Sequence, residues 1–238
     1  MTLQPSLNLL LAQRLLPDFD TRRLVNWAVE AIADGYETES LSVLASMDGD
    51  GTPARDQCFR AAVRELRLST DAEPQRLLRS YATYLARQVT NGRMASLTAL
   101  KDLEKIYAAS DYDSRYQPFY LLAEDLASLR AGRTAILTRD LHIDNVDNVI
   151  AGACAEFLEW EAININPHRW GAVYCFSCRH VDTPADRQNW LGGKPKNLVC
   201  RHCGSGAVGD FASDTDRERI LEVAGNEPQG RHEGLAQP

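Results

Sequence analysis

Apolar residues recur at three- and four-residue spacing from Leu3 to about Asn164, which is the period of an amphipathic helix, and few segments alternate as a strand does. Loop signals such as residues 48–53 and 91–92 divide this region. The pattern predicts helices over residues 5–16, 21–34, 38–47, 54–68, 73–91, 96–108, 115–131 and 145–163. Because short connections place consecutive helices antiparallel, we expect residues 1–166 to form an all-α domain, a compact multi-helix array or bundle.

The pattern changes after residue 166. Residues 170–175 are typical of a strand, and Gly, Pro and Cys interrupt the residues beyond it, so we expect a small β-rich module over residues 167–211. The pattern of residues 214–223 predicts one short acidic helix, and the polar composition of residues 225–238 predicts a disordered tail. Residues 212–238 therefore form a third segment. The predicted fold class is therefore mainly α with a small C-terminal β-rich module.

Four of the six cysteines form two Cys-x-x-Cys pairs, Cys175 with Cys178 and Cys200 with Cys203, separated by 21 residues. Each pair can turn two thiolates inward, and two such pairs supply the ligands of a tetrahedral Zn²⁺ site. Four thiolates leave no open coordination position, so the predicted Zn²⁺ is structural. The alternative of a redox dithiol needs a βαβ unit, which the pattern does not predict.

These two pairs resemble the zinc-ribbon family, in which two knuckles are carried on short hairpins, over about residues 170–211. The resemblance implies a structural zinc ribbon. Gly204 follows the second pair and eases its turn, whereas Arg179 follows the first pair and departs from that pattern. His180 and His202 stay open as substitute ligands.

The composition limits the class of partner and the compartment. In the 238 residues, 33 acidic and 26 basic side chains give a net charge of −7, so the whole molecule should be repelled by phosphate backbones and anionic membranes and attracted to a basic protein. No apolar run approaches the roughly 20 residues of a membrane span, and the leucine-rich N-terminal stretch lacks the basic start of a signal peptide. Cys58 and Cys154 stand alone in helical patterns, which favours a reducing compartment, and we expect the cytoplasm.

The segment between the two cysteine pairs is the candidate contact loop. Side chains from residue 169 to residue 203 carry a net charge of +4, and the rest of the chain carries −11. Trp190 can stack on a base while neighbouring lysines meet phosphate, or it can cover the small core of the zinc ribbon. The candidate partner-binding residues are Arg179, Arg187, Trp190, Lys194 and Lys196.

Recognisable catalytic motifs are missing from the sequence. Asp140, His142 and Asp144 bring three acid/base groups into one short segment, although Asp144 or Asn145 also fits a helix cap. Glutamates at 156, 159 and 161 are typical of a solvated helix face. The acidic pair Glu124–Asp125 is equally consistent with a helix surface and with a loop. Seven aromatic residues lie between positions 81 and 120, and we expect most of them to be buried in the core. The alternative is that they line a partner-binding groove.

A second resemblance concerns residues 21–47, where Trp27 and Gly35–Tyr36 mark two helical patterns joined by a turn. This segment resembles uncharacterised bacterial helical proteins, and the resemblance implies an accessory or immunity role. With no recognisable catalytic motif, we expect a non-enzymatic protein-binding protein, an immunity or regulatory factor with a structural Zn²⁺, whose partner is another protein. Two alternatives stay open: a nucleic-acid-binding protein acting through the zinc ribbon, and an unrecognised hydrolase using His142 and its neighbours.

Overall fold

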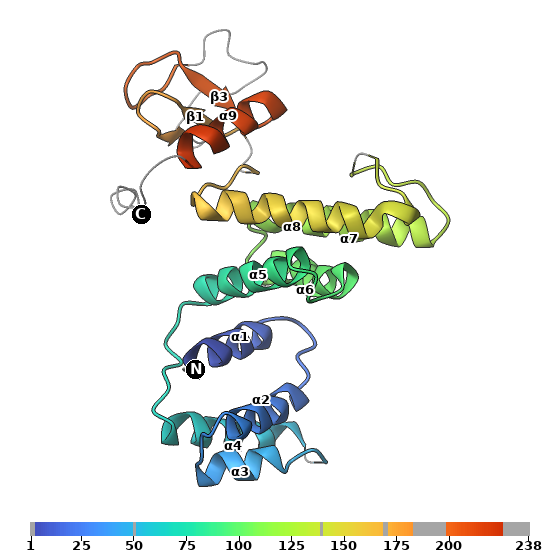
Figure 1. Cartoon of the computed structure of the whole chain (residues 1–238), viewed down its shortest axis with the longest axis vertical. Coiled ribbons are helices and arrows are strands. Elements are labelled where there is room, and N and C mark those ends of the chain that lie inside the picture. Colours follow the sequence, from blue (N-terminus) through green and yellow to red (C-terminus); the bar gives the residue numbers. More distant parts are fainter. Residues whose placement is uncertain (1–2, 50, 139, 169–170, 183–198, 226–238) are drawn as a thin grey trace.

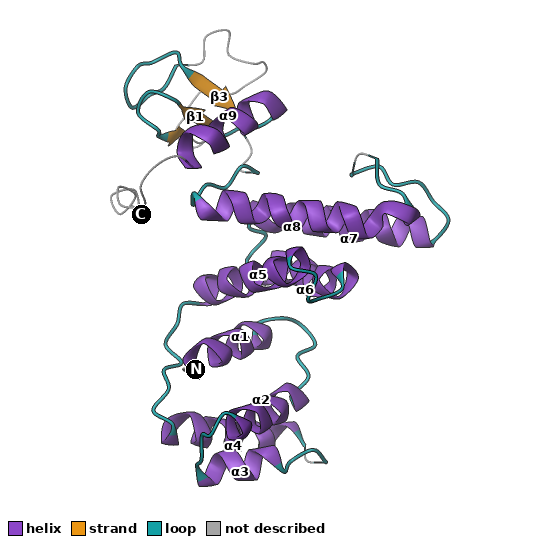
Figure 2. Ribbon diagram, viewed as in Figure 1, coloured by secondary structure: helices purple, strands orange, loops and turns teal. Residues whose placement is uncertain are grey.

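The computed structural model describes residues 3–49, 51–138, 140–168, 171–182 and 199–225. Over these residues, helices occupy most of the chain and strands occur only near its C-terminal end (Figures 1 and 2), which confirms the expected mainly α fold class. The α-helices are α1 (Gln4–Arg14), α2 (Arg22–Ala33), α3 (Glu39–Ala45), α4 (Thr52–Glu65), α5 (Pro74–Thr90), α6 (Ser96–Ala109), α7 (Gln117–Arg130), α8 (Val146–Ala162) and α9 (Asp214–Gly225).

Local sequence signals explain where several helices begin. Proline occupies the first or second position of α1, α4, α5 and α7. Backbone N–H groups at these positions have no partner within the helix, so the missing N–H of proline costs no hydrogen bond. Thr38 caps α3, because its side chain accepts a hydrogen bond from the backbone N–H of Leu41 at 3.2 Å. None of the described helices combines the length and the apolar composition that a membrane span needs.

The helices stack in layers along the long axis of the molecule (Figure 1), so the array is elongated rather than compact as expected. The reason lies in α1, which packs against α2 on one side and against α5 on the other. Its Leu7 and Leu10 belong to a core with α2, α3 and α4, whereas Ala12 belongs to a second core built around α5, α6, α7 and α8. Two cores joined by a shared helix extend the molecule in one direction. We call helices α1 to α8 the helical array.

A three-stranded antiparallel sheet lies beyond the C-terminal end of α8. Its strands are β1 (Val173–Cys175), β2 (Val181–Asp182) and β3 (Val208–Asp210), in the order β2-β1-β3. We call residues 171–182 and 199–225, which contain this sheet and α9, the cysteine module.

The cysteine module packs on the end of the helical array through a small third core. Trp160 of α8 meets Phe211 edge to face, with ring centroids 5.8 Å apart. Ile220 of α9 is fully buried in the same core. The predicted helix at 214–223 is therefore present as α9 and covers the sheet, while most of the predicted tail, residues 226–238, lies outside the described residues.

Candidate metal centre

The first cysteine pair forms a tight turn at the end of β1. The backbone N–H of Arg179 donates to the carbonyl oxygen of Cys175 at 2.7 Å, and the N–H of Cys175 donates to the carbonyl oxygen of His180 at 3.0 Å. These two bonds close a knuckle that holds Cys175 and Cys178 on the same side of the turn. Cys175 is buried and Cys178 is half-buried.

The second pair repeats this geometry. The N–H of Gly204 donates to the carbonyl oxygen of Cys200 at 2.7 Å, and the N–H of Cys200 donates to the carbonyl oxygen of Ser205 at 2.8 Å. The residue pairs have the same sequence separations as in the first knuckle, so two equivalent turns face one another. Cys200 is buried and Cys203 is exposed.

The residue after each pair adopts the left-handed backbone conformation. Gly204 has φ +73°, and Arg179 has φ +64° at the equivalent position of the first knuckle. A left-handed conformation costs a residue with a Cβ atom about 1–2 kcal/mol, whereas glycine adopts it freely. The departure from the zinc-ribbon pattern at Arg179 therefore places strain in the first knuckle.

The four sulfur atoms converge between the two knuckles. The Sγ atoms of Cys175 and Cys203 lie 3.7 Å apart, those of Cys178 and Cys200 lie 3.5 Å apart, and all four lie within 4.8 Å of one another. A tetrahedral ion with metal–sulfur bonds of about 2.3 Å separates its sulfur ligands by roughly 3.8 Å, whereas a disulfide needs about 2.05 Å. The arrangement therefore fits the ligand set of one metal ion.

The electrostatics of the centre also favour a bound cation. Burial disfavours the Cys175 thiolate, but hydrogen bonds from the backbone N–H groups of Cys178 and Ser177 outweigh it and lower the pKa of this thiol to about 7. Burial raises the pKa of Cys178 to about 12 and also raises the pKa of Cys200. Four thiolates at this separation repel one another, so a positive ion is needed to ionise all of them together.

A buried carboxylate that the sequence analysis did not single out braces the second knuckle. Asp182 of β2 is only 2% exposed, and its Oδ2 atom accepts a hydrogen bond from the backbone N–H of Arg201 at 3.2 Å. Its Oδ1 atom lies 3.5 Å from Nε2 of His180, whose ring stacks on His202 with centroids 5.2 Å apart. The group of converging ligand atoms contains the four cysteines alone, with this histidine pair outside it.

Of the candidate partner-binding residues, the structure describes Arg179 alone. Arg179 is exposed at the first knuckle, whereas Arg187, Trp190, Lys194 and Lys196 lie outside the described residues.

The proposed hydrolase trio, Asp140, His142 and Asp144, is exposed. Here the N–H of His142 donates to Oδ1 of Asn145 at 2.8 Å, in a capping box before α8. Among the described residues, no other group of three or more metal-ligating side chains converges.

Comparison with known proteins finds no relative. No protein-family model matches the chain, and no curated protein or solved structure matches it significantly. Its function therefore has to be argued from its own residues.

Proposed function

We propose that this chain is a non-enzymatic protein-binding protein, a bacterial immunity or regulatory factor, whose cysteine module is folded by one structural Zn²⁺. Support for the metal is the closed set of four thiolates on two matching knuckles, which suits Zn²⁺ and leaves no position for a substrate. Elemental analysis of the purified protein should find about one zinc per chain. Iron at the same stoichiometry would contradict the choice of metal.

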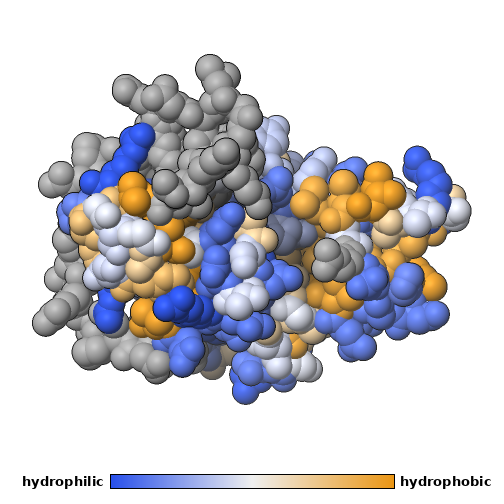
Figure 3. Space-filling view, turned by 90° about the horizontal axis from the view of Figure 1, so that it is seen from above, coloured by the Kyte–Doolittle hydropathy of each residue, from blue (hydrophilic) through white to orange (hydrophobic). Residues whose placement is uncertain are grey.

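The observation that carries the binding function is a displayed apolar loop between α7 and α8. Ile136 is 83% exposed, Ile143 60% and Leu137 49%. Hydrophobic residues gather on the right of the space-filling view (Figure 3), the side on which this loop lies in Figure 1. Exposed apolar side chains gathered in one place are typical of protein interaction sites, because contact with a partner removes them from water.

This loop is held in place by a buried charge. Asp125 of α7 is 1% exposed and accepts backbone N–H bonds from Ile136, Leu137 and Thr138 at 2.9, 2.9 and 2.5 Å. Burial opposes its ionisation, but these bonds outweigh burial and lower the pKa of the carboxyl. A loop fixed before binding loses less conformational entropy on meeting a partner, which strengthens the case for recognition. The expectation from the sequence that Glu124 and Asp125 lie on a helix surface or in a loop is therefore wrong for Asp125.

The chemistry of the partner follows from charge and exposure. A chain with a net charge of −7 attracts a basic protein, and the displayed isoleucines and leucine need an apolar pocket. We infer a basic protein partner whose surface contains such a pocket. The loop lies at the opposite end of α8 from the cysteine module (Figure 1), so the metal would not contact a partner bound there.

The test compares two charged substitutions in tagged full-length protein purified from its native host. Ile136→Glu should abolish recovery of a stoichiometric basic companion, and the purified companion should bind the wild-type chain directly. Val43→Glu on α3, where Val43 is 44% exposed, is the matched control and should retain binding. A companion retained by Ile136→Glu, or no companion in any preparation, would contradict the proposed function.

A further inference from the structure

One face of α5 carries three arginines, although the protein is acidic. Residues 74–101 contain five basic residues and no acidic one. Arg76, Arg79 and Arg87 fall on the face of α5 opposite the buried positions Leu78 and Leu85. Because one residue advances a helix by 1.5 Å, Arg76 and Arg87 lie about 16 Å apart along the axis. This face is therefore a row of positive charge rather than an isolated cation.

The row lines a groove of about 680 Å³, a size typical of ligand sites. Four arginines and one acid, Glu161, contribute to its walls, which gives the lining a net charge of +3. The remaining walls are polar or aromatic. The lining residues are Arg76, Arg79, Ser80, Thr83, Tyr84, Arg87, Gln88, Asn91, Arg93 and Glu161.

Most of this positive charge is not compensated within the described part of the chain. Glu161 of α8 pairs with Arg79 and also with Arg115 at 2.8 Å, so its single charge is shared between two guanidinium groups. The side chains of Arg76, Arg87 and Arg93 make no hydrogen bond or ion pair with any residue that the structure describes. Like charges around one groove repel, and an anion placed between them would remove that repulsion. Glu161, which the sequence analysis assigned to a solvated face, is instead largely buried under these arginines.

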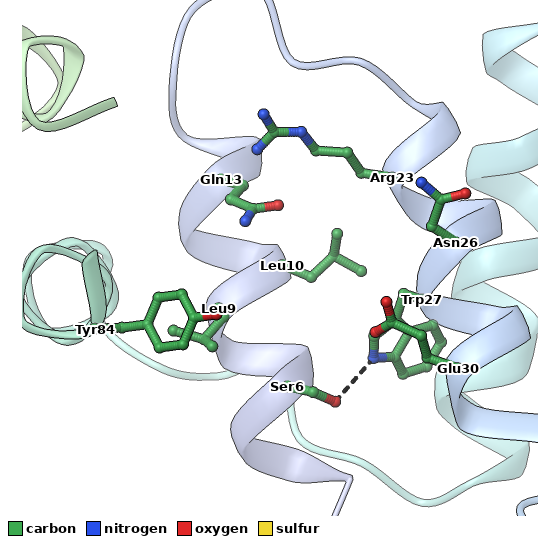
Figure 4. A pocket seen from close by; sticks show the side chains of 9 residues that line it. All are labelled: Ser6, Leu9, Leu10, Gln13, Arg23, Asn26, Trp27, Glu30 and Tyr84. Atoms are coloured by element: carbon green, nitrogen blue, oxygen red, sulfur yellow. Dashed lines mark hydrogen bonds between the residues drawn. The ribbon is translucent and has the colours of Figure 1, made fainter. Parts of the chain in front are cut away.

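An exposed tyrosine lines the same groove beside the row, at a level between Arg79 and Arg87 along the axis of α5. Tyr84 is 37% exposed and lies between Arg76 and Arg79 on one side and Arg87 on the other in the sequence of α5. It also lines a second cavity, of about 320 Å³, between α1 and α2. Figure 4 shows its ring projecting from α5 toward Leu9 of α1. An aromatic ring flanked by arginines can stack on a base while the guanidinium groups meet the phosphates on either side.

We propose that the α5 groove binds single-stranded nucleic acid through arginine–phosphate contacts and base stacking on Tyr84. Cationic groups on both sides of the ring match a strand, in which phosphates flank each base, better than a free nucleotide, whose phosphates lie at one end. The net charge of −7 does not prevent this, because salt screens charges beyond about 10 Å and the groove itself is positive. This binding site is independent of the proposed protein-binding loop and differs from binding through the zinc ribbon.

The experiment measures fluorescence anisotropy of a labelled mixed-sequence 12-nucleotide single strand, as DNA and as RNA, with the full chain at several salt concentrations. The Arg76→Gln/Arg87→Gln double variant should weaken binding and should flatten the plot of log affinity against log salt by about 1.4, since each single-strand phosphate contact contributes about 0.7. Arg22→Gln/Arg60→Gln removes the same charge from exposed sites outside the groove and should leave affinity near wild type. Tyr84→Leu should weaken binding five-fold or more, and Tyr84→Phe should retain most of it.

Competitors and further variants identify the ligand and the site. A mononucleotide or a hexaglutamate peptide that displaces the strand at an equal concentration of charge would overturn the assignment to nucleic acid. Absence of binding at low salt, or equal weakening by the groove and control variants, would overturn the site. Cys200→Ser should leave binding of the single-stranded oligonucleotide intact, because the groove belongs to the helical array. Loss of this binding in Cys200→Ser would instead assign the binding site to the zinc ribbon. Ile136→Glu should also leave it intact, which separates failure of this proposal from failure of the proposed function.

Discussion

We expect the helical array and the cysteine module to reach stability by different means. The core around α5 to α8 contains 22 buried apolar residues among those described, whereas the core of the cysteine module contains seven, including Trp160 and Ile165 from the end of the array. A small core cannot offset the conformational entropy of ordering its chain, and a metal ion held by the four cysteines would add what is missing. The array should therefore fold without the metal, and the module should not.

The two regions also differ in how they fix their loops. The array holds the 136–138 loop with the carboxylate of Asp125, and the module holds two short turns with backbone bonds and brings four cysteine sulfur atoms together between them. A charge-held loop responds to acid but not to a chelator, and a metal-held turn responds to both. A chelator should therefore distinguish the two regions.

The largest effect is expected from removing one ligand. Cys200→Ser should abolish stoichiometric metal binding and disorder the module, because the remaining thiolates cannot complete the tetrahedral set. Cys154→Ser is the matched control, since Cys154 is a free buried thiol in the array and no sulfur ligand lies near it. Metal content by elemental analysis should fall to near zero in the first variant and stay unchanged in the second, as it should in Cys58→Ser. Metal loss in either control would overturn the ligand set.

The next effect concerns the packing of the module beneath α9. A Cβ atom at Gly209 would lie 2.9 Å from ring atoms of Phe176 and 3.3 Å from Ile220, so Gly209→Ala must displace the ring. The Phe176 ring is also covered by the guanidinium of Arg219 at 4.2 Å. We expect a loss of about 1–2 kcal/mol in the stability of the module. Gly206→Ala, which meets nothing within 4 Å, is the control. Chelator titration should release the metal from Gly209→Ala at lower chelator concentration, and equal midpoints for the two variants would refute the close contact.

A pair of effects of similar or smaller size has opposite signs in the two knuckles. Arg179→Gly should stabilise the metal-bound module by about 0.5–1 kcal/mol, because glycine relieves the left-handed strain at φ +64° but adds freedom to the unfolded chain. Gly204→Ala should destabilise it by about 1–2 kcal/mol at φ +73°. The chelator midpoint should rise in the first variant and fall in the second. A shift in the same direction for both would contradict the equivalence of the two turns.

The smallest effect is a local response of the array to pH. Because the pKa of Asp125 is lowered in the folded protein, its contribution to stability is present above the ordinary value near 4 and is lost as the pH falls through the folded pKa. Acidification below about pH 4 should therefore lower the protection of the Ile136, Leu137 and Thr138 amides, measured as the ratio of the intrinsic to the observed exchange rate at each pH. Asp125→Asn should produce the same change at neutral pH. A chelator at neutral pH should leave these amides protected, and loss of their protection on chelation would contradict the distinction between the two regions.

The sequence predicted the features that depend on local spacing. Helical periodicity located the eight helices of the array, and the paired cysteines located the converging sulfur atoms. Small shifts at the boundaries, such as α4 beginning at Thr52 rather than 54, arise because capping and proline geometry act before the first apolar position.

Features that depend on distant contacts could not be predicted in this way. Asp125 and Asp182 look like ordinary acidic residues until the fold brings backbone N–H groups to them. The elongated stack depends on α1 contributing to two cores, which helical periodicity alone does not indicate. The α5 groove did carry a local signal, the absence of any acid from residues 74–101, but its walls include Glu161 of α8.

The most direct test of metal-dependent folding in the module is hydrogen exchange of the full chain, read by mass spectrometry, with and without a zinc chelator. We predict that chelation removes slow exchange from β1, β2 and β3, while the buried helices α5 and α8 keep theirs and most of the helical circular-dichroism signal remains. Restoring Zn²⁺ should restore protection in the strands. Loss of protection in α5 and α8 together with the strands would mean that the array and the module unfold as one unit, and unchanged protection in the strands would mean that the metal does not fold the module.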